Sequence, residues 1–176
     1  SLKFYRESIS LYEAILGENK NSLSLVNAYI NLGEVLLSVN KLEEGKFIIE
    51  KGLDILNSFN KDTKEKYRAL SYLGNYYFRK KKYKISEKYT KEALSILNNI
   101  DEVKPQDKAN SLISLAEVNY KLNKFKKADS LWEEGNKIKI VQIQKQAPFI
   151  PLFDRINFLK TFGYFEPHPG MSIEKR

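Results

Sequence analysis

Side chains that could carry catalysis or bind a metal are scarce in this 176-residue chain. It has no cysteine, and its single histidine, His168, stands between two prolines. A catalytic triad or a histidine–cysteine metal site would have to be built around that one residue. The carboxylate pairs Glu43–Glu44 and Glu133–Glu134 fit solvated helix surfaces, and there is no glycine-rich phosphate loop. We therefore expect neither an enzyme nor a bound metal or cofactor.

Basic side chains are the second chemical feature, with a formal net charge of +8. The densest run, Arg79-Lys-Lys-Lys-Tyr-Lys84, predicts a basic edge that could meet an acidic partner. Aromatic residues are not interleaved for base stacking, because Tyr83 and Phe125 are needed in the core. Nucleic acid is therefore not the favoured partner, and most lysines are interpreted as ordinary exposed residues. The edge would be made of exposed side chains on one rim, namely Arg79, Lys80, Lys82, Lys124 and Lys127.

The chain carries no sign of membrane insertion or secretion. No window approaches the roughly 18 consecutive apolar residues of a membrane span. Its first residues, Ser1-Leu-Lys-Phe4, lack the pattern of a secretory signal. Together with the absence of cysteine, this predicts a cytoplasmic protein.

A tandem repeat organises the sequence. Leu-Gly or Leu-Ala pairs recur at 32–33, 73–74 and 115–116, and each is followed by two small residues seven positions apart. Antiparallel helices approach closely only where side chains are small, so this spacing predicts packed helix pairs. We expect first helices over 22–39, 63–80 and 106–122, and second helices over 42–58, 83–99 and 125–146. The following small residues are Gly45 and Gly52, Ser86 and Ala93, and Ala128 and Gly135.

The predicted helix ends agree with this interpretation. Asp62-Thr-Lys-Glu65 is a capping-box pattern, and Pro105 suits the first turn of a helix. Asn40 and Asn123 fall where a first helix must turn, and asparagine tolerates the left-handed conformation. Lys81 takes that place in the middle repeat.

The pattern resembles the tetratricopeptide repeat (TPR), most clearly in Leu73-Gly-Asn-Tyr-Tyr-Phe-Arg-Lys-Lys-Lys-Tyr83. The period of 41–42 residues resembles the longer kinesin-light-chain type. The resemblance implies an all-α, right-handed superhelical solenoid of antiparallel helix pairs. The sequence departs from the family pattern at Gly45, Gly52, Gly135, Thr90 and Asn119.

Two regions are expected. Residues 1–147 form the repeat domain, in which 3–17 match a second helix without its first, followed by three full repeats. Leu11, Ile15 and Leu16 of that helix would face water, so the chain is either excised from something longer or naturally capped there. Residues 148–176 hold a short helix over 152–162 and an irregular tail. This helix is expected to cap the last repeat; the alternative is a docking element.

The resemblance implies a non-enzymatic scaffold that binds a protein or peptide on the concave face of its first helices. One alternative is a regulatory or sensory module of a larger signalling protein, and another is a groove that is solvated or filled by the tail. Chaperone-binding members of the family grip a C-terminal carboxylate at positions where this chain has Glu34 and Glu117. These glutamates would repel a carboxylate, so we do not expect the chain to bind acidic chaperone tails. The partner and the oligomeric state stay open. By the resemblance, the residues that would face the groove are Asn27, Glu34, Arg68, Ser71, Asn75, Phe78, Arg79, Asn110, Glu117 and Tyr120. The other residues at positions that the family turns toward its groove are Ile30, Leu37, Ser38, Ile113 and Lys121.

Overall fold

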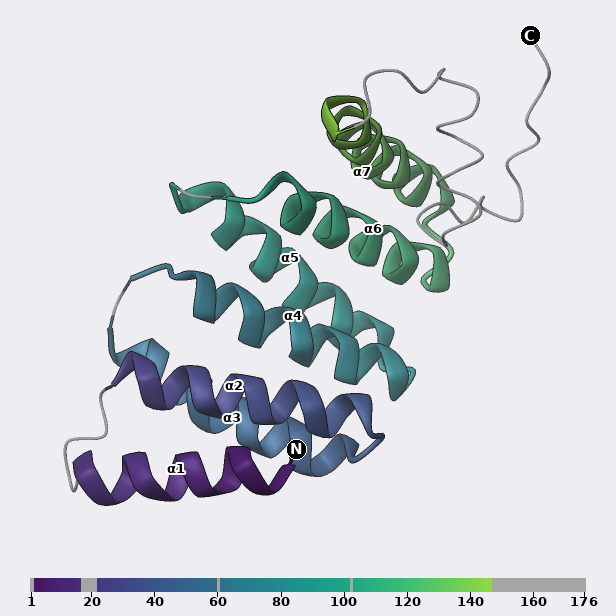
Figure 1. Ribbon diagram of the computed structural model, residues 1–176. Coiled ribbons are helices and arrows are strands. Elements are labelled where there is room, and N and C mark those ends of the chain that lie inside the picture. The colour runs from purple at the N-terminus through teal and green to yellow at the C-terminus, as the bar shows by residue number, and fades with distance from the viewer. Residues whose placement is uncertain (1, 17–21, 60, 102, 147–176) are drawn as a thin grey trace, which may run out of the picture. The chain divides into compact units, whose positions relative to one another are not determined.

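The computed structural model describes residues 2–16, 22–59, 61–101 and 103–146 (Figure 1). These ranges form seven α-helices and no strand. The chain divides into two compact units, Ser1–Val103 with helices α1 to α5, and a second that begins at Lys104 and contains α6 and α7. The helices are α1 (Leu2–Leu16), α2 (Leu23–Ser38), α3 (Leu42–Ser58), α4 (Lys64–Arg79), α5 (Tyr83–Asn99), α6 (Pro105–Lys121) and α7 (Phe125–Gln146).

The helix pairs follow the predicted repeat. The second helices α3, α5 and α7 have the predicted bounds, and the first helices α2, α4 and α6 agree within one residue. Each first helix packs against the second helix that follows it in sequence. The expected short helix at 152–162 and the tail lie outside the described residues.

The turns that join the two helices of each pair share one backbone conformation. Asn40, Lys81 and Asn123 have φ values of 65°, 58° and 59°, so all three predicted positions are left-handed. The residue after each donates its backbone N–H to a carbonyl five positions earlier, as from Lys41 to Leu36 at 2.8 Å. This is the Schellman termination, which satisfies carbonyls that the helix end leaves open.

Helix starts use local chemistry where it is available. The Thr63 hydroxyl accepts a hydrogen bond from the Lys66 N–H at 3.1 Å, which caps α4. Pro105 occupies the first turn of α6, as predicted. The predicted capping box with Asp62 as its first residue is wrong by one position, because the N-cap is Thr63 and the residue three positions after it is Lys66. The Asp62 carboxylate instead accepts a hydrogen bond from the Asn99 side chain at 2.9 Å.

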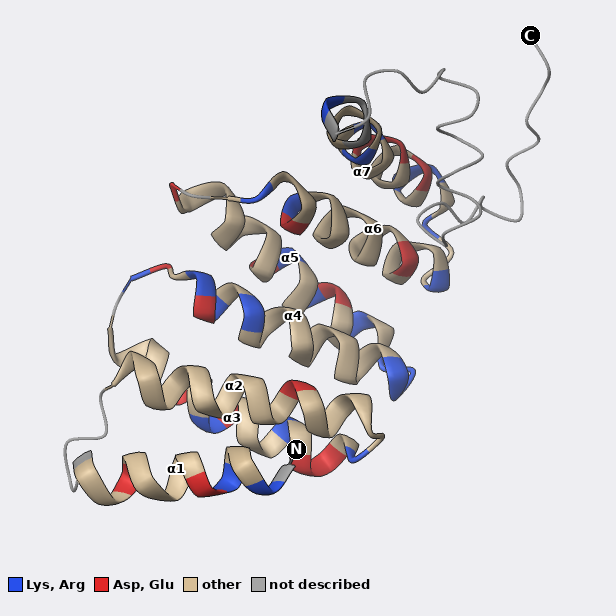
Figure 2. Ribbon diagram, in the orientation of Figure 1, with Lys and Arg blue, Asp and Glu red and all other residues tan. Residues whose placement is uncertain are grey.

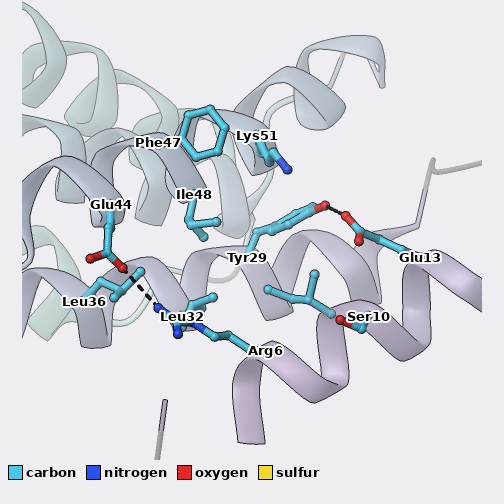
Figure 3. A pocket seen from close by; sticks show the side chains of 11 residues that line it. Arg6, Ser10, Glu13, Tyr29, Leu32, Leu36, Glu44, Phe47, Ile48 and Lys51 are labelled. Atoms are coloured by element: carbon cyan, nitrogen blue, oxygen red, sulfur yellow. Dashed lines mark hydrogen bonds and ion pairs between the residues drawn. The ribbon is translucent and has the colours of Figure 1, made fainter. Parts of the chain in front are cut away.

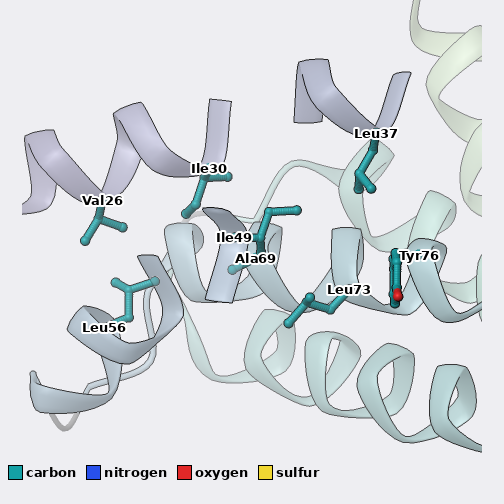
Figure 4. Close-up of a cluster of buried hydrophobic side chains, with 8 residues drawn as sticks. All are labelled: Val26, Ile30, Leu37, Ile49, Leu56, Ala69, Leu73 and Tyr76. Atoms are coloured by element: carbon teal, nitrogen blue, oxygen red, sulfur yellow. The ribbon is translucent and has the colours of Figure 1, made fainter. Parts of the chain in front are cut away.

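The core of the first unit forms where small residues let helices approach. A side chain on Gly33 would overlap Ile49, and one on Gly45 would lie 2.9 Å from Leu37. Ile49 is completely buried, in a cluster of side chains from α2, α3 and α4 (Figure 4). In the next pair, Ser86 donates its hydroxyl to the Gly74 carbonyl at 2.8 Å. The small residues of the repeat therefore bring paired helices together both through apolar contacts and through hydrogen bonds.

Helix α1 packs on α2 by one face only. Ile9 is buried against Leu25 and Leu32, with Tyr5 beside it. On the other face Leu11 and Ile15 are 63% and 70% exposed, as expected for a second helix without its first.

In the described part of the second unit, residues 104–146, α6 and α7 form one helix pair. Ala116 and Ala128 are fully buried at its close approach. The repeat register predicts Trp132 in the core, but it is only half-buried, with its ring centroid 5.9 Å from that of Tyr120.

Two glycines of the first pair should respond oppositely to alanine. In Gly33→Ala the new methyl overlaps Ile49, and overpacking outweighs the gain in helix propensity, so the free energy of unfolding should fall by about 1–2 kcal/mol. In Gly52→Ala the nearest atom is the Tyr29 Cβ at 3.4 Å, so the methyl fits and stability should rise by about 0.5–1 kcal/mol. Urea unfolding followed by circular dichroism measures both. Equal effects would contradict the assigned close approach.

The left-handed lysine gives a second test. Lys81→Gly removes the steric cost of a side chain at φ 58° and should raise the free energy of unfolding by about 0.5–1 kcal/mol. The matched control is Lys82→Gly, which removes the same charge at φ −88° and should lower it. If both variants lose stability, the turn conformation is not the one described.

Candidate peptide-binding face

Polar side chains of the two first helices in the first unit form the predicted groove face. Asn27 and Glu34 lie seven residues apart on α2, and Arg68 and Asn75 do so on α4, so each pair lies on one side of its helix. Glu34 and Asn75 are exposed, while Asn27, Arg68 and Ser71 are half-buried. These five predicted positions therefore remain accessible.

Arg68 links the two helices. Its Nη2 donates to the Asn31 Oδ1 at 2.7 Å and lies 3.3 Å from the Glu34 carboxylate. Its guanidinium also lies 5.9 Å from the Tyr72 ring centroid. Two predicted groove residues, Arg68 and Glu34, thus bind each other directly. Asn31 and Tyr72, which were not predicted, also contact Arg68. The spacing within one helix carries no signal for such a contact between repeats.

The electrostatics of this cluster centre on Tyr72. Burial, followed by its hydrogen bond to Glu34, raises the pKa of Tyr72 to about 12, and Arg68 opposes that shift. The phenol therefore stays neutral at physiological pH, with a hydroxyl able to donate to Glu34.

Two carried-over groove positions are wrong in the first repeat. Ile30 is fully buried and Leu37 is 4% exposed, both in the core cluster with Leu73. For Leu37 the reason is Gly45, because a Cβ at that position would lie 2.9 Å from the Leu37 side chain. Ile30 also lies between α2 and α3, but a Cβ on Gly52 would meet it only at an ordinary 3.6 Å. Neither residue can contact a ligand on the groove face.

The predicted aromatic contacts are partly used inside the helix pairs. The Phe78 ring meets Tyr83 edge-on at 5.5 Å, and Tyr120 meets Phe125 in the same way at 5.3 Å. Phe125 is nevertheless 48% exposed, so its predicted place in the core is wrong. Phe78 and Tyr120 are half-buried, so each retains some surface. Similarly, Ile113 packs where Gly135 leaves room.

In the second unit Asn110 and Glu117 are exposed on α6. The Asn110 amide oxygen accepts a hydrogen bond from Gln106 at 3.2 Å. Within the described ranges, no group of three histidine or acidic side chains is arranged to hold a metal ion.

The basic edge is exposed, but part of it has a structural role. Arg79 donates to the Leu37 carbonyl at 2.6 Å and to Asn40 at 2.9 Å, which ties the end of α4 to the preceding turn. Lys80 pairs with Glu43 at 3.1 Å. Figure 2 shows this basic run at the C-terminal end of α4. Lys82, and in the second unit Lys124 and Lys127, are exposed as expected; their lying on one rim stays a prediction.

A pocket of about 430 Å³ opens elsewhere on the first unit (Figure 3). Helices α1 and α3 form its walls and α2 its floor. None of the predicted groove or basic-edge residues lines it. Its lining is Arg6, Ile9, Ser10, Glu13, Tyr29, Leu32, Leu36, Glu44, Phe47, Ile48 and Lys51.

Comparison with known proteins places this geometry in a fold class. Neither a protein-family model nor a curated protein sequence matches the chain. Among solved structures it is similar to BtubC (BKLC) from P. vanneervenii, at 16% identity and a TM-score of 0.69 over 99% of this chain and 61% of that one. The chain therefore spans less than two thirds of the length of BtubC.

A second similarity is to a putative kinesin light chain from Podosopora anserina with nearly identical TPR-like repeats. Identity is 15% and the TM-score 0.55, over 81% of this chain and 69% of that one. Another crystal structure of the same protein, a substituted form, gives 15% and 0.56, over 81% and 68%. These likenesses show the fold, and they confirm the predicted all-α, TPR-like helical-repeat fold. No helix in the described part of the chain combines the length and apolar composition of a membrane span.

The cluster around Arg68 predicts a specific titration. In Glu34→Gln the pKa of Tyr72 should fall from about 12 toward 10, because a charged acceptor that favours the neutral phenol is lost. It should remain above 10, since burial is the larger cause. The ring ¹³C shifts of Tyr72 measured against pH report this value.

Glu43→Gln is the matched control for this titration. Glu43 accepts a hydrogen bond from Tyr76 at 2.7 Å, so that variant should lower the pKa of Tyr76 and leave Tyr72 unchanged. An unmoved Tyr72 in Glu34→Gln would show that the two side chains do not interact in solution.

Proposed function

From the TPR-like fold as premise, we propose that this chain is a non-enzymatic scaffold that binds an extended segment of a protein on its first helices. This function is supported by side chains that can form hydrogen bonds and are not buried in the core. Asn75 is exposed and has no hydrogen-bond partner among the described residues. An asparagine amide can both donate to and accept from a peptide backbone, so it suits a ligand of varied sequence.

The linked side chains near Asn75 supply rigidity. Arg68, Asn31 and Glu34 hold one another across α2 and α4, so their rotamers are restricted before a ligand arrives. Restricted side chains lose less conformational entropy on binding. A mixed surface of amide, carboxylate and guanidinium groups favours a polar peptide over a purely apolar one.

Binding of a polyanion through the basic edge has less support. Arg79 and Lys80 already pair with groups of the preceding repeat, so a polyanion would compete with those contacts. The cytoplasmic location expected from the sequence accords with this function and is part of the same proposal.

The scaffold function is tested with peptides selected from a random display library against the immobilised protein. A selected peptide is titrated by fluorescence anisotropy against the parent and Asn75→Ala. Losing one backbone hydrogen bond of about 1 kcal/mol should weaken binding roughly fivefold.

Asn98→Ala is the matched control, because Asn98 is an exposed asparagine on the second helix α5. It should bind like the parent. If no peptide is selected, or if every selected peptide binds Asn75→Ala and Asn98→Ala equally well, the partner does not use this face.

A further inference from the structure

The pocket between α1 and α3 lies on the opposite side of α2 from the predicted groove face. At 100° per residue, the α2 side chains on its floor, Tyr29, Leu32 and Leu36, point roughly 180° away from Asn27 and Glu34. The floor is apolar and buried. A ligand could therefore occupy the pocket without touching the groove face.

Phe47 at the pocket wall departs from the repeat. It stands two positions after Gly45, and the equivalent residues after Ser86 and Ala128 are Lys88 and Ser130. All three positions are exposed, and Phe47 is 58% exposed. The packing of the helix pairs therefore does not require an aromatic ring at this position. A large exposed ring beside an apolar hollow is typical of a binding surface.

Lys51 departs from the repeat in the same way. It precedes Gly52, and the equivalent residues before Ala93 and Gly135 are Glu92 and Glu134. Its ammonium lies 5.2 Å from the Phe47 ring centroid and 5.8 Å from that of Tyr29. Among the described residues it has no carboxylate partner.

The two carboxylates that line the pocket are already engaged. Glu13 accepts a hydrogen bond from the Tyr29 hydroxyl, and Glu44 pairs with Arg6 at 3.1 Å (Figure 3). Glu44 also pairs with Lys41 at 3.1 Å. Lys51 is therefore the lining cation without a carboxylate partner among the described residues, and it stands beside the exposed ring, whereas Glu13 keeps its negative charge because the Tyr29 hydroxyl that it binds is neutral.

We infer that the pocket between α1 and α3 is a second docking site, which takes a partner polypeptide through one large apolar side chain followed by a carboxylate. The apolar side chain lies on Phe47 and Ile48 above the floor of α2. The carboxylate pairs with Lys51. This site does not depend on the groove proposed above, and the two can fail separately.

The test uses three synthetic peptides that differ at the two central positions. They are acetyl-Ser-Gly-Phe-Glu-Gly-Ser-amide and its Phe-Lys and Ala-Glu counterparts, titrated into ¹⁵N-labelled protein with shifts followed at the amides of Phe47, Ile48 and Lys51. The Phe-Glu peptide should bind most tightly. The other two should be weaker by about threefold or more, because each lacks one of the two contacts.

The variants copy residues that the other repeats carry at these positions, so they are compatible with the fold. Phe47→Ser should weaken the Phe-Glu peptide by about tenfold. Lys51→Glu should reverse the preference, so that the Phe-Lys peptide becomes the tighter ligand. Lys88→Glu, the same charge change on α5, and Asn75→Ala on the groove face should leave all three affinities unchanged.

Several results would overturn the assignment. They are no shifts at the three amides, equal binding of the Phe-Glu and Phe-Lys peptides, or an unchanged preference in Lys51→Glu. Decanoate binding at these amides without any peptide binding would assign the pocket to a small amphiphile instead. Loss of binding in Asn75→Ala would place the peptides on the groove face.

Discussion

The close approach of paired antiparallel helices at residues with little or no side chain is the constraint on which the structure depends. Gly33 faces Ile49, and Gly45 faces Leu37, with no room for an added Cβ at either glycine. Ridges of one helix can enter the grooves of the other only at such places, so the small residues fix the register of the pair. Once the register is fixed, each remaining position of a helix has a defined direction.

The same constraint decides which side chains are left to bind a ligand. Glycine at 45, where the family has alanine, admits Leu37 into the space between α2 and α3. With Leu37 in the core, the exposed groove positions on the first helix of this repeat are the polar Glu34 and Ser38. A change of the small residue on the second helix therefore changes which side chains the first helix can offer to a ligand.

Much of the fold could be predicted from the sequence because the same pattern of helix and turn positions occurs three times. The left-handed turn at Lys81 was predictable although lysine disfavours it, since Asn40 and Asn123 occupy the same register. The contacts of Arg68 and Arg79 were not predictable, because they join residues 34 to 42 positions apart whose side chains have no fixed geometry in sequence. A run of basic residues looked like a surface for a partner, and part of it proved to hold neighbouring repeats together.

Departures from the repeat have two different causes, and the structure separates them. Thr90 replaces an aromatic residue, yet it is buried and donates its hydroxyl to the Ser86 carbonyl at 2.8 Å, so that departure is absorbed by packing. Phe47 and Lys51 replace residues on exposed surface, where the core gains nothing from them. An exposed aromatic ring has an unfavourable contact with water that folding of this chain does not remove. Such a departure is informative about binding because the fold does not require it, whereas the conforming positions report only how the helices pack.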